Sequence, residues 1–253
     1  PHTAAGSPAP DPPAPEGLLA TLFPRALGDF LAPGPPDPEH RVATIAFVRF
    51  SGTDAVLAEQ GAEALSRTLH AVVSGVEAAL DAEGVTLLAT DLDTDGGKFF
   101  LGAGVPTTSE DDEGRMVRAL RRIADAGLPL PLQLGVNRGH VFAAEVGIPD
   151  RAAYSAMGDT TNTAARIMST AQNGVIHAHP SVLEHSRTRF AVTPAGPFTM
   201  KGKAVPMSVY AVGEEIGTQE AVQDSRLPFL GRDEEATTVR RALEEALTGS
   251  GGV

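Results

Sequence analysis

The chain has 253 residues, enough for one sizeable domain with appendages. Its net charge of −12 argues against binding to nucleic acid, and its lack of cysteine excludes disulfides and thiolate metal sites. No apolar run approaches the roughly 18–20 residues of a transmembrane helix, and no signal peptide is visible, so we expect a cytoplasmic protein without membrane contact. Because it begins with Pro, we interpret it as a piece of a longer protein.

Two segments precede the first expected strand. Residues 1–16 are rich in Pro and Ala, which predicts a disordered linker. Residues 17–40 carry a short amphipathic pattern interrupted by Pro24. They predict a kinked or two-piece helix docked on the domain that follows.

Residues 41–213 alternate between strand and helix patterns. We expect a buried strand at 42–50, a helix at 54–83 that Gly84 stops, and two strands, at 85–92 and 98–104, joined by a tight turn. The elements expected further on are a helix at 109–127, a β-hairpin at 134–147, a helix beginning near Asp159, a strand at 174–178, a short helix at 180–188 and a strand pair within 199–213. This order predicts an α+β fold, a mostly antiparallel sheet with helices over one face.

The stretch 154–168 is the most informative. Gly158 breaks the local pattern, Asp159 is a good N-cap, and the residues that follow favour a helix of about ten residues. Asn162 and Arg166 are four residues apart, so they share one face of that helix. An amide and a guanidinium on one face suit an anionic, oxygen-rich ligand. The alternative is a surface helix with an ordinary arginine.

Several motifs occur in an informative order: a buried strand ending in a turn at 42–54, the pattern GD-x-x-N-x-x-x-R from Gly158 to Arg166, and KGK at 201–203. Together they resemble the catalytic domain of class III adenylyl and guanylyl cyclases. The resemblance covers about residues 41–213 and implies the ferredoxin-like core of that family, in agreement with the strand and helix pattern.

The resemblance implies a site between two catalytic domains. One domain supplies two aspartates that hold two metal ions, and the other supplies the side chains that bind and activate the nucleotide. Asn162 matches the residue that orients the ribose, Arg166 the one that stabilises the transferring phosphate, and Lys201 the one that binds the terminal phosphates. Ser155 falls at a position facing the purine, where a hydroxyl can donate or accept.

The metal side departs from the family pattern. Arg49 stands where the first metal-binding aspartate is expected, and ungapped counting places Gly97 at the second position. The positive charge of Arg49 would repel a magnesium ion at the first position. The nearby carboxylates, which also suit turn positions, are the remaining candidates for metal ligands: Asp91, Asp93 and Asp95.

We therefore predict one half of a cyclase, similar to the second half of bacterial and animal soluble adenylyl cyclases with tandem catalytic domains. Its partner would be an aspartate-bearing cyclase domain upstream in the same protein, and magnesium or manganese would come from that partner only. We expect ATP as the substrate, although GTP stays open because the purine-reading positions depart from the pattern. An isolated chain would be inactive, even as a homodimer. The alternative is a non-catalytic pseudo-cyclase module for dimerisation or for sensing a small ligand or nucleotide.

The C-terminal part, 214–253, has a different character. Polar residues predict a linker, and FLGRDEE followed by an amphipathic pattern resembles the opening of signalling ATPase modules. The chain ends before any G-x-x-x-x-G-K-[ST] motif. A simple C-terminal helix is the alternative interpretation.

Overall fold

The computed structural model describes residues 37–148, 151–199 and 205–218, together with Leu27, Phe30 and the pairs 237–238 and 241–242. The chain divides into two units, 1–219 and 220–253. The expected linker at 1–16 lies outside the described residues, as does most of 17–40 and of 214–253. No helix among the described residues is long and apolar enough to cross a membrane.

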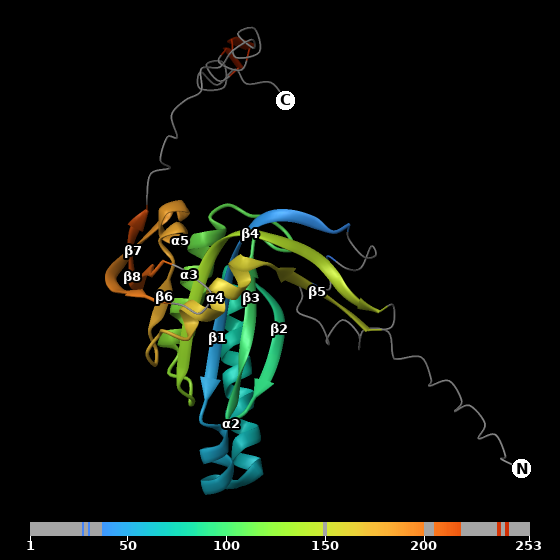
Figure 1. Ribbon diagram of the computed structural model, residues 1–253, viewed down its shortest axis with the longest axis vertical. Helices are drawn as coiled ribbons and strands as arrows, with labels where there is room; N and C mark the ends of the chain where they lie inside the picture. The colour runs from blue at the N-terminus through green and yellow to red at the C-terminus, as the bar shows by residue number, and fades with distance from the viewer. Residues whose placement is uncertain are drawn as a thin grey trace, which may run out of the picture. The chain divides into compact units, whose positions relative to one another are not determined.

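The first unit is built on an eight-stranded sheet with the order β2-β3-β1-β4-β6-β8-β7, and β5 pairs with β4 (Figure 1). All neighbours run antiparallel except β4 and β6. The strands are β1 (Glu39–Ser51), β2 (Thr86–Asp93), β3 (Gly96–Ala103), β4 (Leu132–Ile148), β5 (Arg151–Met157), β6 (Ile176–Ala178), β7 (Thr188–Phe198) and β8 (Met207–Thr218). The expected α+β fold with a mostly antiparallel sheet is confirmed.

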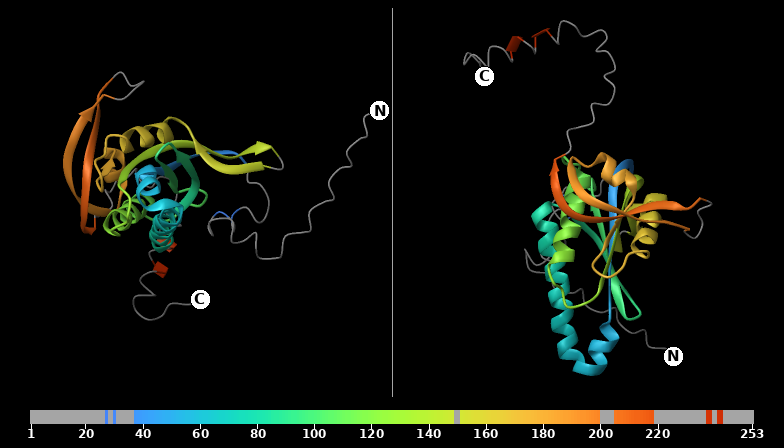
Figure 2. Two further views of the ribbon diagram at one scale, coloured as in Figure 1. Left: turned by 90° about the horizontal axis from the view of Figure 1, so that it is seen from below. Right: turned by 90° about the vertical axis from the view of Figure 1, so that its left-hand side faces the viewer.

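The helices of this unit are α2 (Thr53–Glu83), α3 (Asp112–Asp125), α4 (Asp159–Met168) and α5 (Pro180–His185). Gly84 ends α2 in the left-handed conformation, with φ 62°, as the sequence predicts. Gly61, with φ 85° and ψ 173°, divides α2 into two pieces, and the chain reverses there (Figure 2). Glycine accepts that conformation at little steric cost, so the break falls where the sequence offers one.

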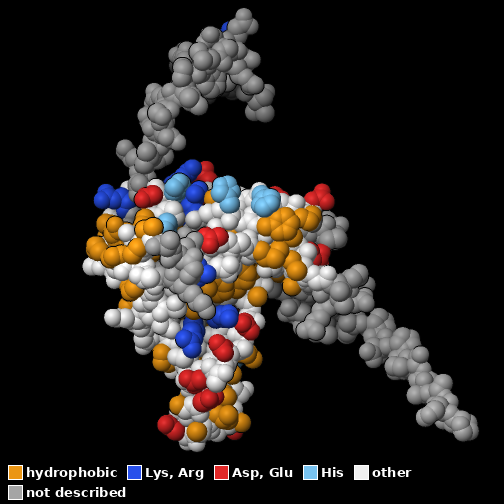
Figure 3. All heavy atoms as spheres, in the orientation of Figure 1, with side chains coloured by type: hydrophobic (Ala, Val, Ile, Leu, Met, Phe, Trp, Pro, Cys, Tyr) orange, Lys and Arg blue, Asp and Glu red, His pale blue; other side chains and the backbone are white. Residues whose placement is uncertain are grey.

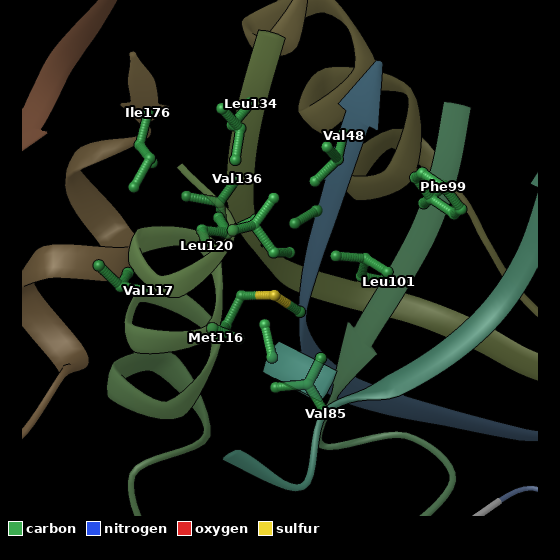
Figure 4. Packing of buried hydrophobic residues seen from close by; sticks show 14 of the residues in the cluster. Val48, Val85, Phe99, Leu101, Met116, Val117, Leu120, Leu134, Val136 and Ile176 are labelled. Atoms are coloured by element: carbon green, nitrogen blue, oxygen red, sulfur yellow. The ribbon is translucent and has the colours of Figure 1, made fainter. Parts of the chain in front are cut away.

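Two apolar clusters cover the two faces of the sheet. Val48 and Phe50 of β1 pack with α2 and α3 on one face, where Met116 and Leu120 project toward the sheet (Figure 4). Ile45 and Phe47, which alternate with them, pack with α4 and β5 on the other face. The expectation of helices over one face therefore holds for α2 and α3, but α4 lies on the opposite face. A central strand that is apolar throughout can be covered on both sides.

The expected hairpin at 134–147 is wrong. Residues 132–148 form one continuous strand, β4, and the hairpin joins β4 to β5 after Ile148. A Cβ on Gly135 would collide with the backbone of Met168, and one on Gly139 would lie 2.7 Å from Oγ1 of Thr160. The glycines in this segment therefore allow α4 to approach the strand closely, rather than turning the chain.

The final strand pair is β7 and β8. It begins at Thr188, upstream of the expected start at 199, and β7 contains Pro194 and Pro197. These prolines obscure the strand pattern, and they are tolerated because β7 is an edge strand of the sheet. Residues 200–204, which include Lys201, lie between the two strands and outside the described residues.

Candidate functional site

The first turn of α4 is anchored to neighbouring strands. Oγ1 of Thr160 donates a hydrogen bond to the carbonyl of His140 at 2.7 Å, and Oγ1 of Thr161 donates to the carbonyl of Ala156 at 2.9 Å. The buried Asn137 donates from Nδ2 to the carbonyl of Thr160 at 3.0 Å. These three bonds fix the position and direction of the helix, and with them the side chains on its outer face.

The expected glycine turn and ten-residue helix are present. The N-cap, however, is Gly158, whose φ of 135° few other residues adopt, while Asp159 is the first helical residue. The N-cap therefore lies one residue before the position predicted from the sequence. Asp159 still places a negative charge in the first turn, where it complements the helix dipole.

Asn162 and Arg166 lie on the side of α4 that faces away from the core. Asn162 is exposed and Arg166 is half-buried, whereas Thr163, Ala164 and Ile167 between and beside them are buried. Within the described part of the chain, neither side chain makes a hydrogen bond or an ion pair. An amide and a guanidinium are thus held on one rigid face with their polar groups available to a ligand.

Ser155 is half-buried on β5, opposite Ala144 of β4. The described residues give its hydroxyl no hydrogen-bond partner. Lys201 is not among the described residues, so its distance from Arg166 is not defined. The ends of its loop are defined, because Phe198 and Met207 pack against the buried Ile167 and Val209. Ile167 follows Arg166 directly, so the cluster that Phe198 and Met207 join includes a residue of α4 next to the arginine.

The ring of His177 supports the same region. It is buried on β6, its centroid lies 5.9 Å from that of the tilted ring of Phe198, and its Nδ1 lies 2.8 Å from Oγ1 of Thr170. That hydroxyl donates to the carbonyl of Ile167 at 2.7 Å, so Nδ1 carries the proton. Burial lowers the pKa of His177, which keeps the ring neutral in this packing.

The two positions expected to bind metal lie on neighbouring strands. In the β1–β3 register, Arg49 is opposite Lys98 and Phe50 is opposite Gly97. A Cβ on Gly97 would be 2.6 Å from the backbone oxygen of Asp91 and 2.7 Å from the ring of Phe50. The strand packing therefore leaves no room for a carboxylate side chain at position 97.

The three candidate aspartates have other partners. Asp91 forms an ion pair with Nζ of Lys98 at 2.9 Å. Asp93 accepts from the backbone N–H of Thr94 at 2.8 Å, and Asp95, in the left-handed conformation, accepts from the N–H of Asp54 at 3.0 Å. Across the described ranges, no group of three carboxylates or histidines is placed to hold a metal ion. Hard divalent cations need several oxygen ligands, so the residues at this place do not fit magnesium or manganese.

A pocket of about 230 Å³ lies here instead, lined by Arg49, Asp93, Gly97, Lys98 and Met168. Below α4 in the view of Figure 3, basic and acidic side chains lie close together on the surface. Arg49, Asp93 and Gly97 were singled out from the sequence, whereas Lys98 and Met168 were not. Only the strand register and the packing of α4 bring these residues together, and neither is visible in a linear motif.

Comparison with known proteins agrees with this architecture. The family model of the adenylate and guanylate cyclase catalytic domain matches residues 36–214, so the chain belongs to this family. An adenylate cyclase of Mycobacterium tuberculosis is 26% identical over 212 residues, a match that covers 79% of this chain and 47% of the relative. The chain thus spans about half the length of the curated relatives it matches.

Solved structures show the same fold. The guanylate cyclase domain of RhGC from Catenaria anguillulae, determined in complex with GTP, has a TM-score of 0.62 at 23% identity, covering 70% of this chain and all of that one. The adenylyl cyclase CyaB from P. aeruginosa has a TM-score of 0.61 at 19% identity, covering 73% of this chain and all of that one. The expected cyclase resemblance is thereby confirmed.

Proposed function

We propose that this cyclase domain is a half-site. It supplies the ribose-orienting and phosphate-stabilising side chains for the conversion of ATP to cyclic AMP and pyrophosphate, while an aspartate-bearing cyclase domain supplies the metal side. The observation that carries the proposal is the contrast between two regions of one chain. Asn162 and Arg166 lie on an anchored helix and their side chains make no hydrogen bond to another described residue, whereas Arg49 and Gly97 occupy the expected metal positions.

The roles follow from the chemistry of the side chains. In the composite site, the amide of Asn162 holds the ribose so that its 3′-hydroxyl faces the α-phosphate. The guanidinium of Arg166 stabilises the negative charge that develops on the transferring phosphoryl group. Lys201 binds terminal phosphates, whose charge is already present in the bound substrate, and Ser155 contacts the purine. The metal ions, held by the partner, would add charge neutralisation.

The partner of this half-site is, in our proposal, a cyclase domain upstream in the same polypeptide. ATP is an intracellular metabolite, so the proposal places the chain in the cytoplasm. Ser155 is the described residue through which ATP would be distinguished from GTP. A hydroxyl can donate to or accept from either base edge, so a comparison of ATP with GTP as substrates of the complex tests this part of the proposal.

The test is a kinetic comparison of variants in complex with an aspartate-bearing domain. Arg166→Ala is expected to lower kcat by roughly 10²-fold or more with a smaller change in KM, because its charge acts mainly in the transition state. Asn162→Ala is expected to lower kcat as well, and Lys201→Ala to raise KM. Arg67→Ala, on the exposed face of α2, is the matched control and should leave both constants unchanged.

A second candidate function is a pseudo-cyclase module that senses a small ligand. The specific observation that favours it is the pocket lined by Arg49 and Lys98 at the place where the family resemblance implies metal. The two candidates differ in the complex: a half-site forms cyclic AMP in a reaction that depends on Arg166, whereas a sensing module leaves the mixture inactive.

A further inference from the structure

The guanidinium of Arg49 is half-buried and poorly satisfied. Its hydrogen bond to Oε1 of Gln133 is long, 3.5 Å from Nη1, and no carboxylate among the described residues pairs with it. The amide of Gln133 is held in this orientation because its Nε2 donates to the carbonyl of Ala171 at 2.7 Å. A guanidinium has five donors, so a fixed cation with most of its hydrogen-bonding capacity unused faces this region.

A second cation lies directly across the strand pair. Lys98 is opposite Arg49 in the β1–β3 register, and its ammonium pairs with Asp91 at 2.9 Å. The side chain of Lys98 is 37% exposed and that of Asp91 is 63% exposed. Ion pairs this exposed contribute little, because water competes for both charges. Lys98 is therefore free to exchange Asp91 for a more strongly bound anion without a large loss in stability.

The pocket between these cations has a size and lining that suit a small ligand. Arg49, Lys98 and Asp93 leave one net positive charge in the lining, and Gly97 contributes bare backbone where a side chain would otherwise project. Its volume of about 230 Å³ is below the roughly 300–1,000 Å³ of pockets that enclose drug-sized ligands. A phosphate group, which is small and anionic, matches both the size and the charge of this space, whereas a nucleoside carries no charge for the two cations to bind.

We propose that this pocket binds a phosphate-type oxyanion directly on Arg49 and Lys98, without a metal ion. The planar guanidinium can donate two parallel hydrogen bonds to such a group, and the ammonium supplies a second charge. Protein cations thus take the place of the divalent ions that the residues here do not fit. The inference needs neither Asn162 nor Arg166, so it does not depend on the half-site function. Met168, the last residue of α4, also lines the pocket.

The experiment is calorimetric titration of the full 253-residue chain with inorganic phosphate in EDTA, with ATP and adenosine in EDTA as parallel ligands. We expect phosphate to bind and adenosine not to bind. Arg49→Gln should weaken phosphate binding by roughly 10-fold or more, as expected for a lost charged hydrogen bond. Lys98→Gln should weaken it less, and Asp91→Asn should tighten it several-fold because it releases Lys98.

Arg67→Gln makes the same change in net charge on the exposed surface of α2 and is the matched control. Equal weakening by Arg67→Gln and Arg49→Gln would overturn the proposal, as would the absence of phosphate binding or a requirement for magnesium. If Arg49→Gln fails to fold, Asp91→Asn, a change at an exposed side chain, provides the test: tighter phosphate binding supports the proposal, and unchanged or weaker binding overturns it. Binding of ATP that depends on Arg49 identifies a nucleotide phosphate as a source of the ligand group, and binding of phosphate alone identifies the free ion.

Discussion

At the scale of single residues, the half-site proposal depends most on positions 49 and 97. Arg49 brings a positive charge to the pocket, and Gly97 is enclosed by Asp91 and Phe50. Replacing Arg49 can remove the positive charge, but position 97 has no space for a carboxylate side chain. The departure from the family pattern is therefore built into the packing of β1, β2 and β3, and it extends beyond a single substitution.

This packing gives a prediction about metal binding. Nucleotide-free calorimetry should find no micromolar magnesium or manganese site in the native chain or in Arg49→Asp, since one added carboxylate does not make a site for a hard cation. The double variant Arg49→Asp, Gly97→Asp should also fail to bind and should melt at a lower temperature than Arg49→Asp alone, because the new Cβ must displace backbone. A micromolar site in the native chain would point to Asp91, Asp93 or Asp95.

At the scale of elements, an ionic network ties the end of α2 to α3 and β7. Arg118 of α3 donates to Glu83 at 2.8 Å, to Asp111 at 3.2 Å and to Thr188 at 2.6 Å. Burial acts to raise the pKa of Glu83, but hydrogen bonds from Arg118 and Arg122 outweigh it and lower the pKa. The pKa of Asp111 is lowered in the same way, with burial opposed mainly by bonds from Thr188 and from backbone N–H groups.

Two lowered carboxylate pKa values make the stability of the domain dependent on pH in a defined direction. Their contribution is complete above the ordinary pKa values of 4.5 and 3.8 and is lost as the pH falls through the lower folded-state values. Arg118→Gln should therefore cost about 1.5–3 kcal/mol at pH 7, and its difference from the native chain in Tm should shrink below pH 4.

Thermal melts between pH 7 and pH 3 measure this difference. Asp112, whose pKa burial raises, has the opposite pH dependence, but it is present in both proteins and so drops out of the comparison. Arg67→Gln, which breaks an exposed ion pair with Glu63, should follow the native chain throughout. A gap between Arg118→Gln and the native chain that stays constant down to pH 3 would rule out the network as its source.

The close contact of α4 with β4 gives a second prediction at this scale. A side chain on Gly139 would meet Oγ1 of Thr160, which anchors the helix. Gly139→Val should therefore destabilise the domain by about 1–3 kcal/mol, or roughly 2–4 °C in Tm for each kcal/mol. Adding Thr160→Ala removes the colliding hydroxyl, so the double variant should lose less than the sum of the single losses. Strictly additive losses would contradict this packing.

The glycines of β4 also explain why the hairpin predicted at 134–147 was wrong. Strand and helix patterns with clear punctuation, such as α2 ending at Gly84 or the tight turn between β2 and β3, were predicted correctly. The segment around Gly139 was expected to form a hairpin at 134–147, since the role of this glycine in helix packing depends on α4, a distant segment. Asn162 and Arg166 could be placed on one helical face from their spacing, and the structure agrees. Lys98 could not be paired with Arg49, because pairing requires the register of β1 and β3.

At the scale of the whole molecule, our proposal gives this chain the nucleotide-binding half of a composite site, since the described residues include no group of three carboxylates or histidines placed to hold a metal ion. A symmetric pair of these chains would have two copies of Asn162 and Arg166, and Arg49 and Gly97 at both sites in place of the two expected aspartates. The function we propose therefore requires an unlike partner.

The most direct test is a complementation measurement. A cyclase domain that keeps its metal-binding aspartates, but whose own asparagine and arginine equivalent to Asn162 and Arg166 are replaced by alanine, should be inactive by itself. This chain should be inactive by itself too. We expect the mixture to form cyclic AMP with magnesium or manganese present, and the Arg166→Ala chain to restore at most about 1% of that rate. Cyclic AMP formation by this chain alone, or full recovery with Arg166→Ala, would contradict the half-site account.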